Sequence, residues 1–172
     1  MEQVNISEYN PHWAWEFEQE KLKIAEALEG IVLGIEHIGS TSVPGLGAKP
    51  IIDIMAGVSA LDEITPVHRV RLERIGYHFV DHPHFPERRF FRRGEWRAGT
   101  HHLHVYRHEG EHWNMQLLFR NYLIRHPEAL KDYFRLKQNL AQLYPHDRAK
   151  YTEAKGSFIR KIIELARAEN EN

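Results

Sequence analysis

The stretch HIGSTSVPGLGAKPIIDI, residues 37–54, decides the fold of this chain. An apolar, β-branched run over residues 31–38 predicts a strand, and residues 39–42 must then form a turn or loop. Residues 50–58, PIIDIMAGV, predict a second strand that is apolar except for Asp53. A carboxylate in the middle of a mostly buried strand needs hydrogen-bond partners or a cation. The pattern therefore places a chemically constrained aspartate beside a glycine-serine loop.

Helices and short strands follow and precede this pair of strands. Apolar residues at helical spacing predict helices over residues 11–29 and 61–75, from about residue 113, from residue 127, and over residues 151–168. Short strands are predicted at residues 77–80, 88–93 and 101–107, the last two joined around residues 94–99. The order predicts an α+β (mixed α/β) fold, with a mixed β-sheet flanked by helices and additional C-terminal helices, in one domain spanning residues 1–172.

Composition limits the classes of function. The chain has 172 residues, 42% of them hydrophobic and 27% charged, which excludes a disordered protein. The net charge of −1 makes nucleic acid an unlikely partner, and the absence of cysteine excludes thiolate metal sites. The N-terminal segment has no secretory pattern, and no run approaches the roughly 18 apolar residues of a membrane helix. We therefore expect a cytoplasmic protein without a membrane partner; its oligomeric state is left open.

The loop and the second strand contain the parts of a phosphate site. Glycine lets the backbone approach a phosphate group closely, and loop N–H groups and hydroxyls can donate to its oxygens. A lysine adds positive charge, and Asp53 could hold Mg²⁺ together with phosphate oxygens and water. The alternative is a tight turn whose amides bind Asp53. The candidate phosphate or nucleotide ligands are Gly39, Ser40, Thr41, Ser42 and Lys49.

Arginines on a later strand could extend this site. The run RRFFRR, residues 88–93, offers guanidinium groups that bind phosphate with paired hydrogen bonds. In a strand it divides into Arg-Phe-Arg on each face, and Arg89 or Arg93 would be a phosphate clamp if it lies on the pocket side. The competing interpretation is an exposed edge strand protected by charge. Lys155 could reach an anion from the last helix, although a solvated lysine is the ordinary interpretation.

The longer string GSTSVPGLGAKPIIDI resembles the GrpB family, and the resemblance continues along nearly the whole chain. NPHWAWEFEQE is similar to the opening helix of that family, and HLHV, FRNYL, YFRLK and YTEAKGSFI are similar to its later landmarks. A Gly-Ser pair after a strand, with a carboxylate on the following strand, also resembles the nucleotidyltransferase signature. The resemblance implies a nucleotidyltransferase-like fold. It supplies no substrate.

The chain departs from an active nucleotidyltransferase at two positions. Such enzymes carry a second carboxylate two residues after the first, where this chain has Met55. They carry a third on a later strand, where this chain has His102 and His104, which share one strand face. Two imidazoles and Asp53 would suit zinc, iron or manganese. His37, just before the turn, could orient Asp53 or the loop; for all three histidines an ordinary structural role is the alternative.

Three functions follow as hypotheses. The first is a nucleotide or phosphate-ester binding domain with a divalent metal (Mg, Mn or Zn) on Asp53 and metal-dependent nucleotidyl transfer as its reaction. The second is a degenerate, non-catalytic nucleotidyltransferase that binds a ligand or a partner protein. The third is a metal-dependent hydrolase that uses Asp53, His102 and His104. A nucleotide or a phosphorylated small molecule is the expected partner of the first.

Overall fold

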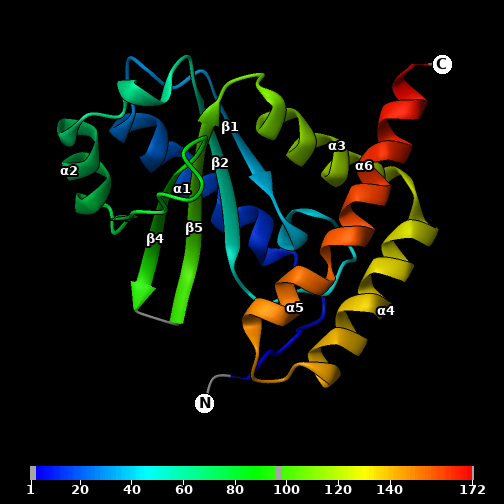
Figure 1. Cartoon of the computed structure of the whole chain (residues 1–172). Coiled ribbons are helices and arrows are strands. Elements are labelled where there is room, and N and C mark those ends of the chain that lie inside the picture. The colour runs from blue at the N-terminus through cyan, green and yellow to red at the C-terminus, as the bar shows by residue number, and fades with distance from the viewer. Residues whose placement is uncertain (1–2, 96–97, 172) are drawn as a thin grey trace.

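A five-stranded mixed sheet lies at the centre of the computed structural model, which describes residues 3–95 and 98–171 (Figure 1). Its strands are β1 (Gly34–Ile38), β2 (Ile52–Val58), β3 (His78–Val80), β4 (Arg89–Glu95) and β5 (Ala98–Arg107). They lie in the order β1-β2-β5-β4-β3. Only the β2–β5 pair is parallel; the other neighbours are antiparallel. The mixed α/β architecture expected from the sequence is confirmed. The tip between β4 and β5, residues 96–97, lies outside the described residues.

Helices cover both faces of the sheet. They are α1 (His12–Ala27), α2 (Pro66–Arg74), α3 (Glu111–Arg125), α4 (Pro127–Leu143), α5 (Arg148–Ala154) and α6 (Gly156–Asn170). The helix predicted at residues 61–75 begins only at Pro66, because proline is well suited to the first helical turn and Thr65 precedes it in an extended conformation. The helix predicted at 151–168 is divided into α5 and α6. Within the described ranges, no helix is long and apolar enough to cross a bilayer.

The predicted first strand is also shorter than its apolar run. The N–H groups of Ile31 and Val32 donate to the carbonyl of Leu28, at 3.2 and 3.1 Å, so these residues close the turn after α1. Pairing with β2 then starts at Gly34. Local hydrogen bonding to the helix end therefore overrides the β-propensity of the first residues in the run.

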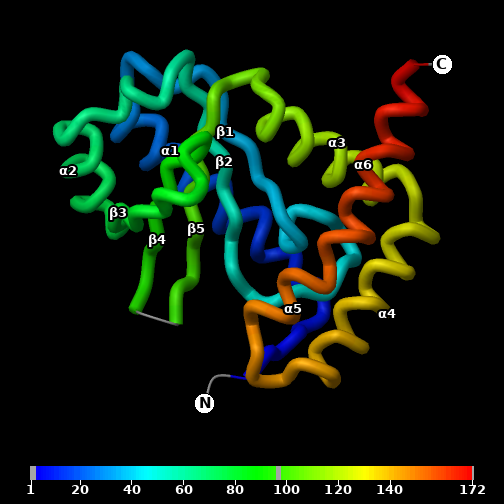
Figure 2. Tube along the Cα trace, viewed as in Figure 1, coloured from blue at the N-terminus to red at the C-terminus, as the bar shows by residue number. Residues whose placement is uncertain are grey.

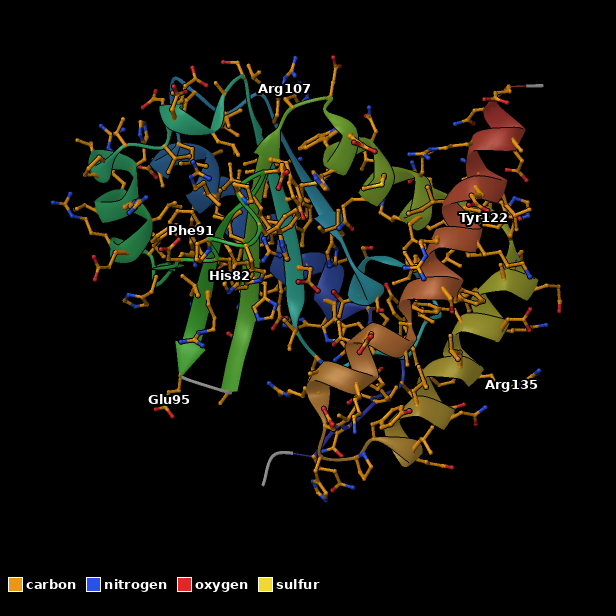
Figure 3. The ribbon with its side chains drawn as sticks, in the orientation of Figure 1. His82, Phe91, Glu95, Arg107, Tyr122 and Arg135 are labelled. Atoms are coloured by element: carbon orange, nitrogen blue, oxygen red, sulfur yellow. The ribbon has the colours of Figure 1, made fainter. Side chains whose placement is uncertain are left out.

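The main core fills the space between one sheet face and the helices α1 and α2. Ile54, Leu103 and Phe91 point to this side, where the side chains around Phe91 are drawn (Figure 3). The opposite face carries α3, and the C-terminal helices α4 and α6 pack farther out on that side (Figure 2). Val43 and Leu46, from the loop after β1, insert among those outer helices. The loop thus joins the sheet to the C-terminal helices.

A buried charge network ties α1 to the sheet edge. Glu20 is 5% exposed, accepts a hydrogen bond from the hydroxyl of Tyr77 at 2.9 Å, and binds the guanidinium of Arg93. Lys23 adds a contact at 3.1 Å. Burial alone would raise the pKa of Glu20, but the hydrogen bonds from Arg93, Lys23 and Tyr77 outweigh it and lower the pKa.

Glu20→Gln should lower the free energy of unfolding by about 2 kcal/mol at pH 7. This loss is smaller than the roughly 3–5 kcal/mol expected for breaking a fully buried ion pair, because Arg93 is partly exposed. Because the folded pKa of Glu20 is depressed, its contribution is complete above the unfolded value of about 4.3 and is lost as pH falls through the folded value. Urea denaturation at pH 7 and pH 3 should therefore show the gap between wild type and variant shrinking in acid. Glu18→Gln, on the exposed side of α1, is the control. A gap that stays constant with pH would contradict this account.

Candidate functional site

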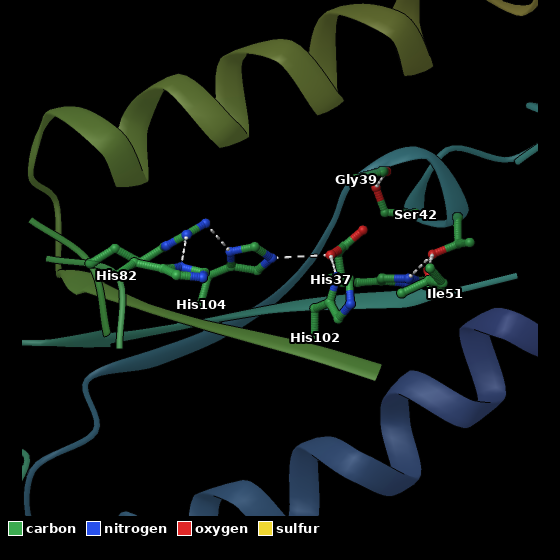
Figure 4. Close-up of polar contacts among 10 residues, drawn as sticks. His37, Gly39, Ser42, Ile51, His82, His102 and His104 are labelled. Atoms are coloured by element: carbon green, nitrogen blue, oxygen red, sulfur yellow. Dashed lines mark hydrogen bonds and ion pairs between the residues drawn. The ribbon is translucent and has the colours of Figure 1, made fainter. Parts of the chain in front are cut away.

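The parallel pairing of β2 with β5 assembles the site. The register places Asp53 opposite His102 and Met55 opposite His104, so all four side chains share one sheet face. One carboxylate oxygen of Asp53 lies 3.0 Å from Nε2 of His104 and 3.3 Å from Nδ1 of His102. Figure 4 shows this contact in the middle of the sheet, below a helix. We call Asp53, His102 and His104 the Asp–His cluster.

Arg88 determines which nitrogen of His104 carries the proton. Its guanidinium lies 3.3 Å from Nδ1 of His104 and 2.7 Å from Nδ1 of His82, a chain of contacts visible in Figure 4. A guanidinium can only donate, so both Nδ1 atoms must accept. The proton of neutral His104 therefore resides on Nε2 and is donated to Asp53.

The electrostatics agree with this arrangement. Burial alone would raise the pKa of Asp53, but the hydrogen bonds from His102 and His104 outweigh it and hold the pKa well below its usual range. Burial lowers the pKa of His104, although Asp53 opposes that shift. At neutral pH the cluster therefore contains one negative carboxylate and a neutral His104.

The loop after β1 approaches Asp53 closely. Gly39 has φ of +70°, and a Cβ atom there would lie 2.7 Å from the second carboxylate oxygen of Asp53. Both features require glycine. The carboxylate is thus within reach of the loop, as the spacing of the motif predicts.

The hydroxyls of the loop already have internal partners. Thr41 is buried, donates to the carbonyl of Ile51 at 3.2 Å and contacts Nε2 of His37 at 2.9 Å. Ser42 donates to the carbonyl of Gly39. Ser40 bonds the hydroxyl of Tyr133 on α4. The expected phosphate-donating role is thus not visible in this geometry for Thr41 and Ser42, because their hydroxyls hold the loop in shape.

His37 lies on the opposite face of the sheet from Asp53. Its ring stacks on Phe17 of α1 at a centroid distance of 4.8 Å, and burial lowers its pKa to about 4. A neutral imidazole at physiological pH can donate to Thr41 without placing a charge in the core. His37 therefore supports the loop and does not contact Asp53.

Two expected phosphate ligands point away from the site. The register pairs Arg89 with Val105 and Arg93 with His101, which places both on the face opposite the Asp–His cluster. Arg93 binds Glu20, and Arg89 donates to the carbonyl of Pro86 at 3.0 Å. The prediction that Arg89 or Arg93 binds phosphate at this site is therefore wrong, because both side chains lie on the other face of β4. Arg92 pairs with His102 and lies on the side of Asp53, with Arg88 just before β4.

Met55 is completely buried beside the Asp–His cluster. It packs with Ile38, Tyr106 and Trp113 in an apolar group under α3. Among the described residues, the only group of three or more potential His or acidic ligands close enough to hold a metal is the Asp–His cluster. The arrangement lacks the second carboxylate that two adjacent ions require.

An open cleft of about 800 Å³ begins at His102. It extends over the end of the sheet towards the start of α5, and we call it the cleft. Its lining includes Lys49, Arg92, His146 and Arg148, which come from three separate segments of the chain, together with the acid Asp147. A cleft that places these lysine and arginine side chains near His102 suits an anionic ligand.

Known proteins match this chain along most of its length. The sequence model of the GrpB protein family matches residues 3–165. The chain belongs to the GrpB family. It is 34% identical to the glutamate-rich protein GrpB of Alkalihalophilus pseudofirmus, over 94% of each chain. It is also 34% identical to the UPF0157 protein YqkA of Bacillus subtilis, over 95% of this chain but 47% of that longer one.

A solved GrpB structure has the same fold. The crystal structure of the conserved protein GrpB from Enterococcus faecalis superposes with a TM-score of 0.88 at 37% identity, covering 98% of this chain and all of that one. The GrpB resemblance read from the sequence is therefore confirmed. The relation to nucleotidyltransferases stays a prediction.

Arg88 is the residue beside the Asp–His cluster of this GrpB-family chain that the sequence interpretation missed, and Lys137, a lysine buried on α4, was missed as well. Alternation along a strand gives the RRFFRR run two equivalent faces. The sequence alone therefore does not show that Arg88, and not Arg89, faces Asp53. Lys137 is spaced four residues from Tyr133 and three from Leu140, both buried on the inner side of α4. That helical spacing was the available signal for a buried lysine.

Gly39→Ala should lower the free energy of unfolding by about 2–4 kcal/mol, because it adds strain at positive φ and a Cβ collision with Asp53. Gly45→Ala is the matched control: its φ is +85° and nothing lies within 4 Å of an added Cβ, so only backbone strain of about 1 kcal/mol applies. Urea denaturation measures both. Equal losses would show that the close approach to Asp53 carries no energetic weight.

Proposed function

We propose that this chain is a phosphate-ester binding domain with a single divalent-metal centre on Asp53, His102 and His104. The observation that carries the proposal is that one ligand atom from each residue lies within 4.8 Å of the others. Metal–ligand bonds of about 2.1 Å give ligand–ligand distances of about 3.0 Å at right angles and about 3.4 Å in a tetrahedron. The separations of 3.0 and 3.3 Å around Asp53 fit these values.

The composition of the ligand set supports zinc, manganese or iron more than magnesium. Two imidazoles with one carboxylate are typical of those metals and leave positions open for water or a ligand. Magnesium prefers oxygen ligands throughout. Such an ion would supply a Lewis acid that polarises a phosphoryl oxygen. His102 borders the cleft, so a ligand bound there reaches the centre directly.

Hydrolysis of a phosphate ester fits this arrangement better than two-metal nucleotidyl transfer. Two ions about 3.5–4 Å apart need several anionic ligands, and the position beside Asp53 is held by buried Met55. A single centre with open positions is the usual arrangement of metal-assisted hydrolysis.

A non-catalytic ligand-binding domain is the second candidate. The hydrogen bond from His104 to Asp53 favours it, because the carboxylate is already satisfied without a metal. Binding a metal through Nε2 would require the proton of His104 to move to Nδ1, where Arg88 now donates. The metal and Arg88 therefore compete for His104, and metal titration separates the two candidates.

The test is titration of the protein with Co²⁺, followed by its visible absorption. Asp53→Asn, His102→Ala and His104→Ala should each weaken Co²⁺ binding by about tenfold or more, since each removes a ligand or its charge. His101→Ala is the matched control, because His101 neighbours His102 on β5 but faces the other side of the sheet. Wild-type affinity in all three cluster variants would overturn the metal centre.

Arg88→Met should have the opposite sign in the same titration. It removes a positive charge and releases Nδ1 of His104, so Co²⁺ should bind about tenfold more tightly. Unchanged or weaker binding would show that Arg88 and the metal do not compete, and the argument from the proton of His104 would be wrong.

Met55→Asp tests whether a second metal position survives. The variant buries an unpaired carboxylate and should lose about 3 kcal/mol or more of stability. Met55→Leu keeps the volume and should lose less than about 1.5 kcal/mol. We expect melting curves of both variants to respond equally to millimolar Mg²⁺. A rise with Mg²⁺ in Met55→Asp alone would restore the two-metal interpretation.

A further inference from the structure

Beyond the Asp–His cluster, two lysines contact the ring of Tyr151, and a third, Lys137, is close enough to both to interact with their charges. Lys137 on α4 is 2% exposed, and its ammonium donates to the carbonyl of Gly47 at 2.7 Å. The ammonium groups of Lys49 and Lys155 lie 4.7 and 4.6 Å from the centre of the same Tyr151 ring. We call Lys49, Lys137 and Lys155 the lysine cluster.

Two of the three lysines have no carboxylate among the described residues close enough to form an ion pair. Over residues 3–95 and 98–171, neither Lys137 nor Lys155 forms an ion pair, and the ammonium of Lys155 has no hydrogen bond. Within the same described ranges, the buried hydroxyl of Tyr151 has no hydrogen-bond partner either. Buried charges in folded proteins are normally paired or bound to an ion of opposite sign.

The charges oppose one another in the absence of an anion. Burial, together with the charges of Lys155 and Lys49, lowers the pKa of Lys137 to about 7, although the charge of Asp53 opposes the shift. Burial also lowers the pKa of Lys155. Burial and mutual repulsion therefore disfavour the protonated forms of these lysines, which does not stabilise the fold. An anion bound between the lysines would favour the protonated forms.

We propose that the lysine cluster binds the phosphate group of the ligand, so that the ligand class is a phosphomonoester or a polyphosphate. The inference rests on the proposed function for the identity of the ligand, but not for binding of the anion itself. Lys49 lines the cleft together with His102, and the carboxylate of Asp53 acts electrostatically on both Lys137 and Lys155. One ligand could therefore contact both clusters.

The contacts of the neighbouring loop fit this role. Ser40 bonds Tyr133, whose ring lies 5.4 Å from the ammonium of Lys137. The Gly39 loop, which contacts Asp53, and the helix that carries Lys137 are thus joined by direct contacts. An anion held by the lysine cluster would lie where the loop, α4 and the start of α6 meet.

The test is calorimetric titration with inorganic phosphate and with tripolyphosphate, in EDTA so that no divalent metal takes part. Wild type should bind at least one of them, and Lys155→Met should weaken binding about tenfold or more. Lys131→Met is the control on α4, since Lys131 is 63% exposed and forms an ion pair with Glu128. Tighter binding of tripolyphosphate than of phosphate would identify a polyphosphate ligand, and the reverse a phosphomonoester.

Melting curves show whether the lysine has a structural role instead. Without phosphate, Lys155→Met should melt at the same or a higher temperature than wild type, because it removes an unpaired, partly buried charge. With phosphate, only wild type and Lys131→Met should gain stability. A variant that melts lower without phosphate yet binds phosphate normally would overturn the proposal, as would failure of wild type to bind either anion.

The metal centre is assessed separately. Lys155→Met should keep its Co²⁺ affinity within about twofold, because Lys155 contacts none of the proposed ligands. Asp53→Asn should lose Co²⁺ binding and retain phosphate binding in EDTA. Phosphate binding without Co²⁺ binding would therefore refute the metal centre alone, and the converse would refute the lysine site alone.

Discussion

The partial burial of one carboxylate, that of Asp53, constrains the rest of this structure. Asp53 lies on an interior strand, where an ionised group needs donors on every open side. The parallel register of β2 and β5 supplies His102 and His104, and the turn after β1 supplies a residue without a side chain, Gly39. Neither a one-residue shift of β5 nor a Cβ on Gly39 is compatible with that contact. The shape of the loop, and the helices that pack against it, follow from this requirement.

Much of this arrangement is predictable from local sequence. Alternation along β5 places His102 and His104 on one face, and Asp53 is exceptional as the one charged residue of an apolar strand. The strand predicted from residue 50 starts at Ile52, so Asp53 lies near its beginning and not in its middle. The sequence predicts Gly39 directly after one strand and Asp53 on the next strand, with a turn and loop between them, which is what forms. The helix start at Pro127 is equally local, because proline is well suited to the first helical turn. Pro66 carries the same signal, but the apolar spacing over residues 61–75 led to a start predicted five residues too early.

The sequence does not predict which arginines of β4 face Asp53, nor which residues far apart in the chain contact one another. The RRFFRR run reads equally well with either arginine set facing Asp53, and only its pairing with β5 resolves the choice. That pairing places Arg93 beside Glu20, a partner 73 residues away. The lysine cluster is similar, because Lys49, Lys137 and Lys155 converge only through the packing of α4 and α5. Long-range convergence leaves no periodic signal in one sequence.

The two clusters suit ions of opposite charge, and buried Met55 affects both because it is not a second carboxylate. The Asp–His cluster has one negative carboxylate and is proposed to hold a cation, whereas the lysine cluster is proposed to hold an anion. With neutral imidazoles, a divalent ion on Asp53 would leave a net positive charge, which favours a phosphate group beside it. A second carboxylate at position 55 would cancel that charge and repel the same phosphate. Because Met55 is apolar, the site keeps a single carboxylate. A metal on Asp53 would then retain a net positive charge, and a phosphorylated ligand could bind beside it.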